Sequence, residues 1–424
     1  MARSALLSRI APPPGPPTVL AAGQLTNSVG DGAYYVCSVL YFTRIIGLSP
    51  TQIGLGLTIG WAVGFLMGVP LGHLADRFGT RGVATLLALG TSVAVASFLV
   101  VRTFPLFLVS VVVYATCQSG LSAARQALLA ALVERQDRTK TRAYLQAVTN
   151  AGIAIGAAIG GLALQFDTKE AYLAVIGMDA VSFLLSALLV LKLPPVAPVP
   201  HVEGEPKLAV LRDKPYALIS FLNMIMLLRM PIISLATPLW ITERTNAPTW
   251  MVSALLVLNT AVVMLFQVRV ARKVTDLGSA SKIVTQSGWV MFLSCVVFAF
   301  SQIHAAVWIP VAILLVAATI QVIGEMQQSA GAWEMSFELA PADKQGQYQG
   351  FFGAGLPVAR MLGPLLLVTL IVEWGAPGWI LLGVVFLASG LATGPAVRWA
   401  ERTRPVTPRP APEPLNVPGA PGTD

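Results

Sequence analysis

Long apolar segments are the feature of this sequence that most restricts its fold. Twelve such segments recur along the 424-residue chain, and each holds about 20 residues, the length at which an α-helix crosses ~30 Å of hydrocarbon. Hydrophobic residues make up 55% of the chain and charged residues 11%, whereas a soluble domain has roughly 25% charged residues. The sequence therefore predicts an all-α membrane protein with twelve transmembrane helices in a lipid bilayer.

The predicted spans form two groups of six, separated by a polar stretch that is rich in proline. The first group comprises 18–43, 51–71, 82–101, 104–128, 144–165 and 171–192. The second group comprises 215–240, 249–268, 283–302, 305–328, 350–372 and 377–398. We therefore expect a cytoplasmic N-terminal tail at 1–17, a six-helix bundle at 18–192, a cytoplasmic linker at 193–214, a second six-helix bundle at 215–398 and a disordered cytoplasmic tail at 399–424.

Positive charges are distributed unevenly between the two sides of the predicted membrane. The chain has 28 Lys and Arg against 20 Asp and Glu, a net charge of +8. The loops on the side of the termini, in which Arg142 is counted, hold 21 of these cations, the opposite loops hold 4, and the spans hold 3. Cytoplasmic loops carry such an excess, so we expect both termini in the cytoplasm of a multi-pass cell-membrane protein. A nucleic-acid-binding protein would not sort its charges by alternate loops, and we expect no nucleic-acid partner.

A short polar segment connects the second and third spans. Gly72, Asp76, Arg77, Gly79 and Arg81 follow the spacing Gly-x-x-x-Asp-Arg-x-Gly-x-Arg. The glycines allow helix ends to approach and turn sharply, and the two central charges can cap helix ends or bridge to neighbouring helices. An isolated segment of this composition would be an ordinary Gly-rich turn. Placed after a span, the pattern resembles the signature loop that follows the second helix in the major facilitator superfamily.

Small residues recur at four-residue spacing in the fifth span. Gly152, Gly156, Gly160 and Gly161 resemble the Gly-x-x-x-Gly-Pro-x-x-Gly-Gly pattern of proton-coupled, drug/proton-antiporter-like exporters of that superfamily, with Ala157 at the proline position. Such a face lets another helix pack closely. The alternative is a packing face with no role in coupling.

The two groups of spans carry a faint internal duplication. Residues 156–161 align with residues 359–364 at an offset of 203. Parallel halves related by an axis along the membrane normal would leave such a repeat. We therefore expect the major facilitator fold, in which two pseudo-symmetric six-helix bundles face each other.

Ionisable residues inside the predicted spans are candidates for function, since each costs at least ~2.5 to 3.5 kcal/mol at mid-bilayer. Asp31, Arg125, Arg229 and Glu325 lie in the first, fourth, seventh and tenth spans, and Arg360 lies in the eleventh. The resemblance implies that the first, fourth, seventh and tenth spans line a central cavity. Two acids and two bases would then face it.

Depth along the helices suggests how these charges pair. Counted from the cytoplasmic ends of their spans, Asp31 and Arg229 share one level, whereas Arg125 and Glu325 share a level nearer the cytoplasm. We hypothesise that Asp31 and Arg229 form a central proton-coupling site and that Arg125 and Glu325 form a gate. The alternatives are a structural pair in the first case and two side chains that extend separately into water in the second.

Other polar residues within the spans either contact substrate or hold helices together. Arg360 is assigned to gating, with Asp76 and Glu334 as possible partners. The remaining polar candidates are Asn27, Tyr34, Asn223, Asn259 and Gln267.

The favoured function is secondary active transport, with proton-coupled export of a small, partly apolar molecule by alternating access. Proton-linked uptake or facilitated diffusion of a small metabolite remains open, because both use the same fold. We find no Gly-x-x-x-x-Gly-Lys loop for ATP, so the energy would come from an ion gradient or from the substrate's own. The expected partners are the substrate and a proton, and we expect a monomer.

Two other classes of function are disfavoured. The sequence has no His/Glu metal spacing and no Gly-x-Ser-x-Gly elbow, so we expect no enzyme, no catalytic residue, no metal and no cofactor. A channel or receptor would not need duplicated halves around a charged middle, which favour alternating access.

Overall fold

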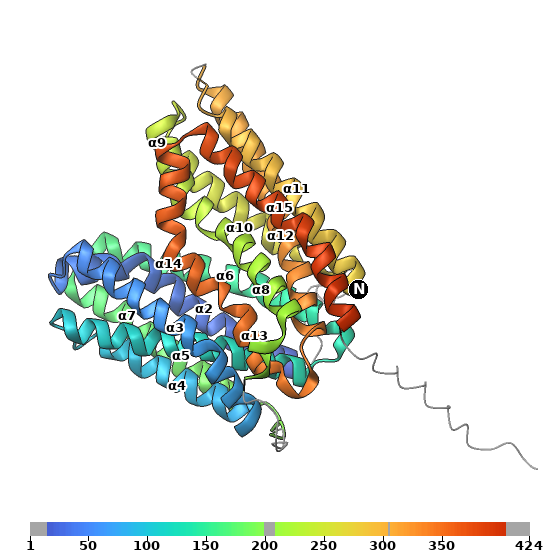
Figure 1. Cartoon of the computed structure of the whole chain (residues 1–424). Helices are drawn as coiled ribbons and strands as arrows, with labels where there is room; N and C mark the ends of the chain where they lie inside the picture. The colour runs from blue at the N-terminus through green and yellow to red at the C-terminus, as the bar shows by residue number, and fades with distance from the viewer. Residues whose placement is uncertain (1–14, 199–207, 304–305, 404–424) are drawn as a thin grey trace, which may run out of the picture.

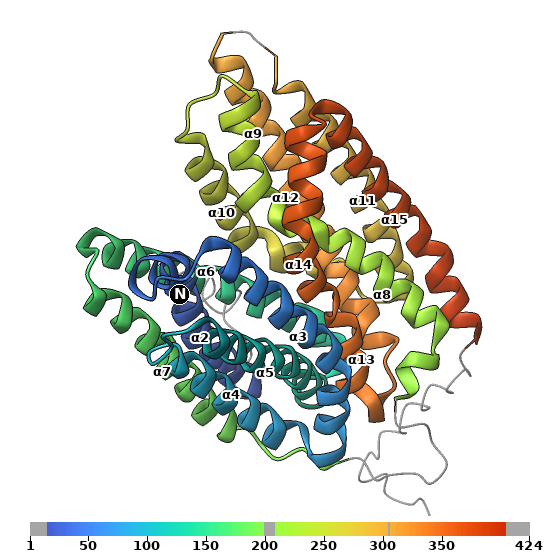
Figure 2. The same ribbon diagram turned by 60° about the vertical axis from the view of Figure 1, so that its left-hand side comes forward.

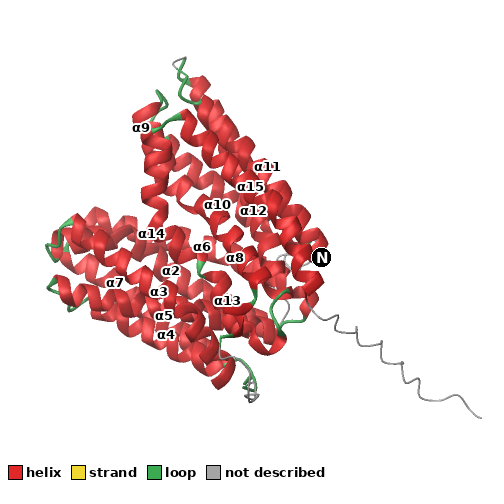
Figure 3. Cartoon of the chain, viewed as in Figure 1, coloured by secondary structure: helices red, strands yellow, loops and turns green. Residues whose placement is uncertain are grey.

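The computed structural model of the protein describes residues 15–198, 208–303 and 306–403. Helices joined by short loops make up these ranges, and no strand occurs within them (Figure 3). The C-terminal tail, for which the sequence predicts disorder, lies mainly outside the described ranges. Most of the N-terminal tail and the centre of the linker also lie outside them.

The first half contains six long helices, most of which are continuous. They are α2 (Pro16–Leu40), followed by a π-helical turn (Tyr41–Ile45), α3 (Pro50–Phe78), α4 (Thr80–Ser97), α5 (Phe104–Leu132), α6 (Arg138–Phe166) and α7 (Lys169–Leu191). Local sequence sets their ends: Ser49 and Gln52 form a reciprocal capping box before α3, and Pro50 occupies its first turn. Gly79, at φ 95°, separates α3 from α4.

The second half also crosses six times, but two of its crossings are broken. It comprises α8 (Lys214–Met226), α9 (Thr237–Arg244), α10 (Met251–Ala271), α11 (Leu277–Phe300), α12 (Trp308–Glu338), α13 (Gln345–Gly353), α14 (Gly355–Leu367) and α15 (Ala376–Thr403). Short 3-10 and π-helical turns (Leu227–Arg229 and Ile232–Ala236) join α8 to α9, and a π-helical turn (Val368–Glu373) follows α14.

Prolines account for the two breaks. Pro231 follows Leu227 by four residues, and Pro357 follows Gly353 by four residues. Because proline has no N–H, the carbonyl four residues earlier loses its helical donor. The α-helix accordingly stops at Met226 in one crossing and at Gly353 in the other.

Eleven of these helical segments, within the described ranges, are long and apolar enough to cross a membrane. The twelfth crossing is α2, which has 25 residues but carries Gln24, Asn27 and Asp31. The predicted all-α fold with twelve transmembrane helices in two bundles is confirmed.

The two bundles meet at one end and diverge at the other (Figures 1 and 2). Where they meet, α3 packs against α13 and α6 packs against α10. The ends that diverge carry the α6–α7 connection in one bundle and α9 in the other. Each bundle has an apolar core of its own, around Phe98 and Phe107 in the first and around Phe298 and Trp379 in the second.

Candidate functional site

A cavity of about 330 Å³ lies between the halves. Its walls come from α2, α3, α5, α6 and α7 of the first half and from the α13–α14 crossing of the second, together with Met230 of the seventh crossing. Among the residues that the structure describes, four charged side chains line it: Asp31, Arg125, Arg142 and Arg360.

Asp31 is partly buried in this cavity, on α2. Arg125 and Arg360 are the cations that act on its carboxylate, and Asn27, one helical turn earlier, is its side-chain neighbour. Among the described residues, the Oδ1 atom of Asp31 has no hydrogen-bond partner. A carboxylate oxygen is therefore left for a proton or a ligand.

Arg125 is held by neutral groups. It donates a hydrogen bond to Ser186 Oγ at 2.8 Å and a long one to Asn27 Oδ1 at 3.5 Å. Asn27 itself is buried and lines the cavity. Asp31, Asn27 and Arg125 are thus brought together at the wall of the cavity.

Arg360 enters the cavity from α14 of the other half. Its side chain is exposed to that space, and its guanidinium carbon lies 4.5 Å from the centre of the Trp61 ring. The predicted partners are engaged elsewhere: Asp76 accepts backbone hydrogen bonds, and Glu334 accepts one from Thr139.

Arg142 is a cavity residue that the sequence did not indicate. The apolar span begins at Tyr144 and so predicts a loop at Arg142, but α6 begins at Arg138. The extra turn and a half of helix places Arg142 at the cavity, where its guanidinium carbon lies 5.3 Å from the centre of the Trp333 ring. Its Nε has no hydrogen-bond partner among the described residues.

Of the two adjacent tyrosines of α2, the sequence indicates Tyr34 as a cavity candidate, but the structure places Tyr35 at the cavity instead. Tyr34 is 6% exposed and stacks on Phe98 with 6.0 Å between ring centres, away from the lining. Tyr35 is 44% exposed and lines the cavity. Consecutive helical residues point about 100° apart, so only one of them can face the cavity.

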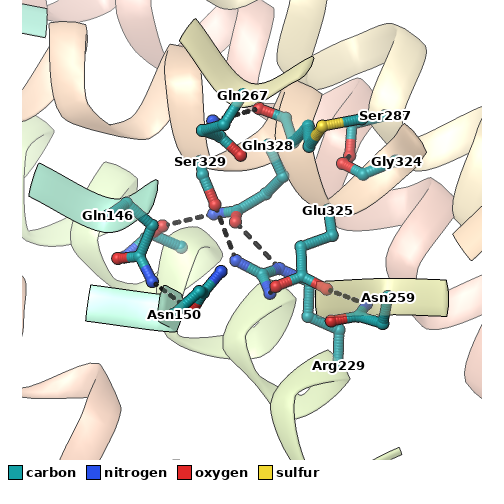
Figure 4. A network of polar contacts seen from close by, with 12 residues as sticks. Gln146, Asn150, Arg229, Asn259, Gln267, Ser287, Gly324, Glu325, Gln328 and Ser329 are labelled. Carbon is teal, nitrogen blue, oxygen red and sulfur yellow. Dashed lines mark hydrogen bonds and ion pairs between the residues drawn. The ribbon is translucent and has the colours of Figure 1, made fainter. Parts of the chain in front are cut away.

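A second polar cluster lies within the second half (Figure 4). Arg229, which is 5% exposed, forms an ion pair with Glu325 at 2.9 Å and donates hydrogen bonds to Gln328 at 3.1 Å and to Ser329 at 2.8 Å. Asn259 donates to Glu325 at 3.1 Å, and Gln328 donates to Asn223 at 2.7 Å. Every charge in this cluster has a partner from its own bundle.

The hypothesised pairs are therefore wrong for this structure. Of the ion pairs among described residues, none joins Asp31 to Arg229 or Arg125 to Glu325, because Arg229 binds Glu325 instead. The error came from taking the tenth span to end at Gln328. The helix α12 continues to Glu338, so Glu325 lies near its middle, at the level of Arg229 rather than near the cytoplasm.

At the end where the bundles meet, α3 binds the N-terminus of α13. Asp76 accepts hydrogen bonds from the backbone N–H of Gly346 at 2.6 Å and of Gln347 at 2.9 Å. A carboxylate is favoured there by the free N–H groups and the helix dipole. Gly72 faces Gly346 so closely that a Cβ on either would overlap the other's backbone.

Most residues of the signature segment lie on helices rather than in a loop. Gly72, Asp76 and Arg77 belong to the last turns of α3, Gly79 forms the junction, and Arg81 lies in the first turn of α4. Arg81 donates to the carbonyl of Leu193 at 2.8 Å, which ties α4 to the end of α7.

Three of the four glycines in the α6 motif face α2. A Cβ at Gly152 would meet Ser28, one at Gly156 would meet the backbone of Val29, and one at Gly160 would meet that of Ala33. Gly161 does not belong to this face, since a Cβ there would meet nothing within 4 Å. These glycines hold the helix that carries Asp31 against α6.

Comparison of sequences links the chain to membrane transporters. Residues 20–288 match the family model described as Major Facilitator Superfamily. The uncharacterized MFS-type transporter YttB of Bacillus subtilis (strain 168) is 24% identical over 385 residues, which cover 88% of this chain and 93% of that protein.

Solved structures at low identity share the fold. A bacterial homologue of the iron transporter ferroportin in an outward-facing state has a TM-score of 0.73 at 16% identity and covers 91% of this chain and 99% of its own. The human organic anion transporter MFSD10 (TETRAN) has 0.68 at 14%, covering 90% and 100%. The fucose:proton symporter FucP of E. coli has 0.65 at 13%, covering 91% and 98%.

Proposed function

Because the chain belongs to the Major Facilitator Superfamily, we propose that it is a proton-coupled secondary transporter that exports a small, partly apolar molecule across the cell membrane by alternating access. The observation that carries the proposal is Asp31, a titratable carboxyl in a cavity between two bundles. Its unpaired oxygen and its two neighbouring cations let a single proton change the charge that a substrate meets.

The orientation follows from the loop charges. With both termini in the cytoplasm, as the excess of Lys and Arg predicts, the end where the bundles meet faces the cytoplasm and the divergent end faces outward. Asp76 bound to α13 then closes the cytoplasmic side. Alternating access requires that this contact breaks when the cavity opens inward.

The cluster around Arg229 does not act as a gate in this proposal. Its members bind one another within the second bundle, so we assign it to keeping the broken seventh crossing attached to α12. The residues of the cytoplasmic closure are instead Asp76, Arg135 and Glu338.

Export rests on the similarity of the α6 glycines to those of proton-coupled exporters. One observation favours proton-linked uptake as a second candidate. Asp31 is the only acidic residue among the described residues that line the cavity, and it lies among three arginines. Protonating it makes the cavity more positive, so a proton and an anionic substrate would bind together.

Proteoliposomes with an internal pH-sensitive dye test the coupling. A panel of small organic compounds is added on either side of an imposed pH gradient, and proton movement is recorded for wild type, for Asp31→Asn and for the exposed control Asp343→Asn. We expect compound-driven proton movement in wild type and control only. Undiminished coupling in Asp31→Asn would contradict the proposal, and the direction of proton movement distinguishes export from uptake.

A further inference from the structure

We infer that the substrate is an organic anion, held by the arginines of the cavity, and that its binding is strengthened when Asp31 takes up a proton. This inference rests on the second candidate of the proposed function, proton-linked uptake, because a proton and a substrate that favour each other's binding cross together; it names the substrate class of the same cavity. It concerns the sign of the charge that the cavity accepts, which the fold alone leaves undetermined.

The side chains that line the cavity carry a net positive charge. Arg125, Arg142 and Arg360 line the cavity together with one acid, Asp31, so the described lining has an excess of two positive charges. Glu325 gives no compensation, since it is bound to Arg229 and lies outside the lining. A cationic substrate would meet this excess as repulsion, whereas an anion reduces it.

The guanidinium groups of these arginines have few hydrogen-bond partners in the protein. Arg125 binds only neutral oxygens, from Ser186 and Asn27. Arg360 and Arg142 each lie over a tryptophan ring, and the Nε of Arg142 has no hydrogen-bond partner among the described residues. Guanidinium groups away from bulk water are costly unless they are paired. The planar donors of arginine match a carboxylate, sulfonate or phosphate oxygen pair, which the substrate would supply.

Part of the cavity wall is apolar. Trp61, Ile153, Met230 and Leu356 lie among the lining residues, and the volume of about 330 Å³ is at the small end of the range for ligand pockets, about 300–1,000 Å³. The walls therefore suit a small molecule with an acidic group at one end and an apolar or aromatic body.

The sign of the proton effect follows from what faces Asp31. The charged and titratable groups around it are Arg125 and Tyr114 on α5, Arg360 on α14, Asp179 on α7, and Tyr34 and Tyr35 on α2 itself. Protonating Asp31 removes the negative charge that competes with the substrate for the arginines. By thermodynamic reciprocity, the anion and the proton then favour each other's binding.

A matched set of fluorescent probes tests the charge preference. Dansylglycine, dansylamide and dansylcadaverine carry the same aromatic group with an anionic, neutral or cationic end. Binding to the full-length protein in nanodiscs is measured from the fluorescence change after subtraction of empty nanodiscs. We expect dansylglycine to bind at least about tenfold more tightly than dansylcadaverine, and to bind more tightly still when the pH falls from about 7 to about 4.5, toward the range in which an aspartate takes up a proton.

Variants of the cavity give the matched controls. Arg360→Gln should lower the affinity for dansylglycine about tenfold and leave that for dansylamide unchanged, Arg360→Lys should keep part of the preference, and the exposed control Lys169→Gln should behave as wild type. Asp31→Asn should bind dansylglycine independently of pH.

Equal or tighter binding of the cationic probe, absence of saturable dansylglycine binding, or weaker binding at low pH would each overturn the inference. Failure of the proposed function is distinguishable. A protein that couples protons to a cation or a neutral compound keeps that function and refutes only the anion, whereas selective anion binding without any transport refutes the function alone.

Discussion

Arg135 and Glu338 form an ion pair between the two bundles, and they lie 203 residues apart in the chain. Arg135 begins the 3-10 turn that follows α5, and Glu338 is the last residue of α12. The pair therefore joins the cytoplasmic ends of the fourth and tenth crossings. Opposite charges let this contact attract, whereas two identical charged residues would repel.

Reversing one charge of this pair should favour opening of the end where the bundles meet. Arg135 is 69% exposed, so the pair contributes at most about 1 kcal/mol, and we expect Glu338→Arg to shift the conformational equilibrium severalfold. The measurement is the distance between spin labels at positions 169 and 243, on the divergent ends, in a chain whose three cysteines are replaced by alanine. Adding Arg135→Glu should restore most of the wild-type distribution, and no restoration would argue against the pair.

Asp76→Asn should have a larger effect at the same end. An asparagine replaces one of the two acceptor oxygens by an NH2 group, which would face a backbone N–H, so it cannot keep both hydrogen bonds from Gly346 and Gln347; it also loses the interaction of a charge with the helix N-terminus, about 1 kcal/mol. We expect the spin labels to approach in a population increased about fivefold. The nearby exposed Asp343→Asn is the control. Unchanged distances in Asp76→Asn would show that this contact does not close the cavity.

Substitution of the α6 glycines should separate two faces of one helix. Gly156→Val places a Cβ into the backbone of α2, an overpacking that costs about 1–3 kcal/mol, and should lower the thermal unfolding midpoint and transport together. Gly161→Val adds the same side chain where nothing lies within 4 Å and should be tolerated. Equal midpoints for the two variants in detergent would contradict the packing described here.

Breaking the ion pair between Arg229 and Glu325 should affect the stability of the fold more than the choice of substrate. Glu325→Gln leaves the charge of Arg229 buried, and breaking a buried pair costs up to about 3–5 kcal/mol. The double variant Arg229→Met and Glu325→Leu removes both charges, and it should unfold at a higher denaturant concentration than Glu325→Gln alone. If the double variant is less stable than the single one, the cluster stabilises the fold by more than the neutralisation of one charge by the other.

The number and grouping of the crossings could be predicted from the sequence, because the bilayer imposes one length on every apolar segment. The ends of the helices could not. An apolar run stops near the membrane surface, but the helix continues wherever its backbone bonds are satisfied, as α12 does to Glu338 and α6 does from Arg138. The pairing of Arg229 with Glu325 and the position of Arg142 both depended on these extensions.

The direction in which side chains point was the second feature that could not be predicted from the sequence. The crossing α2 is apolar on most of its surface, so its sequence does not indicate which of Tyr34 and Tyr35 faces the cavity. The close approach of Gly72 to Gly346 likewise joins residues of different halves, and the motif alone indicated only that small residues were needed there.

The breaks after Met226 and Gly353 make the two bundles mechanically unequal. A helix that loses backbone hydrogen bonds at one level bends there at little cost, whereas α5, α6 and α7 of the first bundle run unbroken and have no proline in their interior. The first bundle is then suited to move as a stiff lever, and the second contains two joints close to Arg229 and Arg360. The outer segments α9 and α14 can swing inward over a bound molecule before the rest of their bundle rotates, so trapping of the substrate and reorientation of the protein become separate steps.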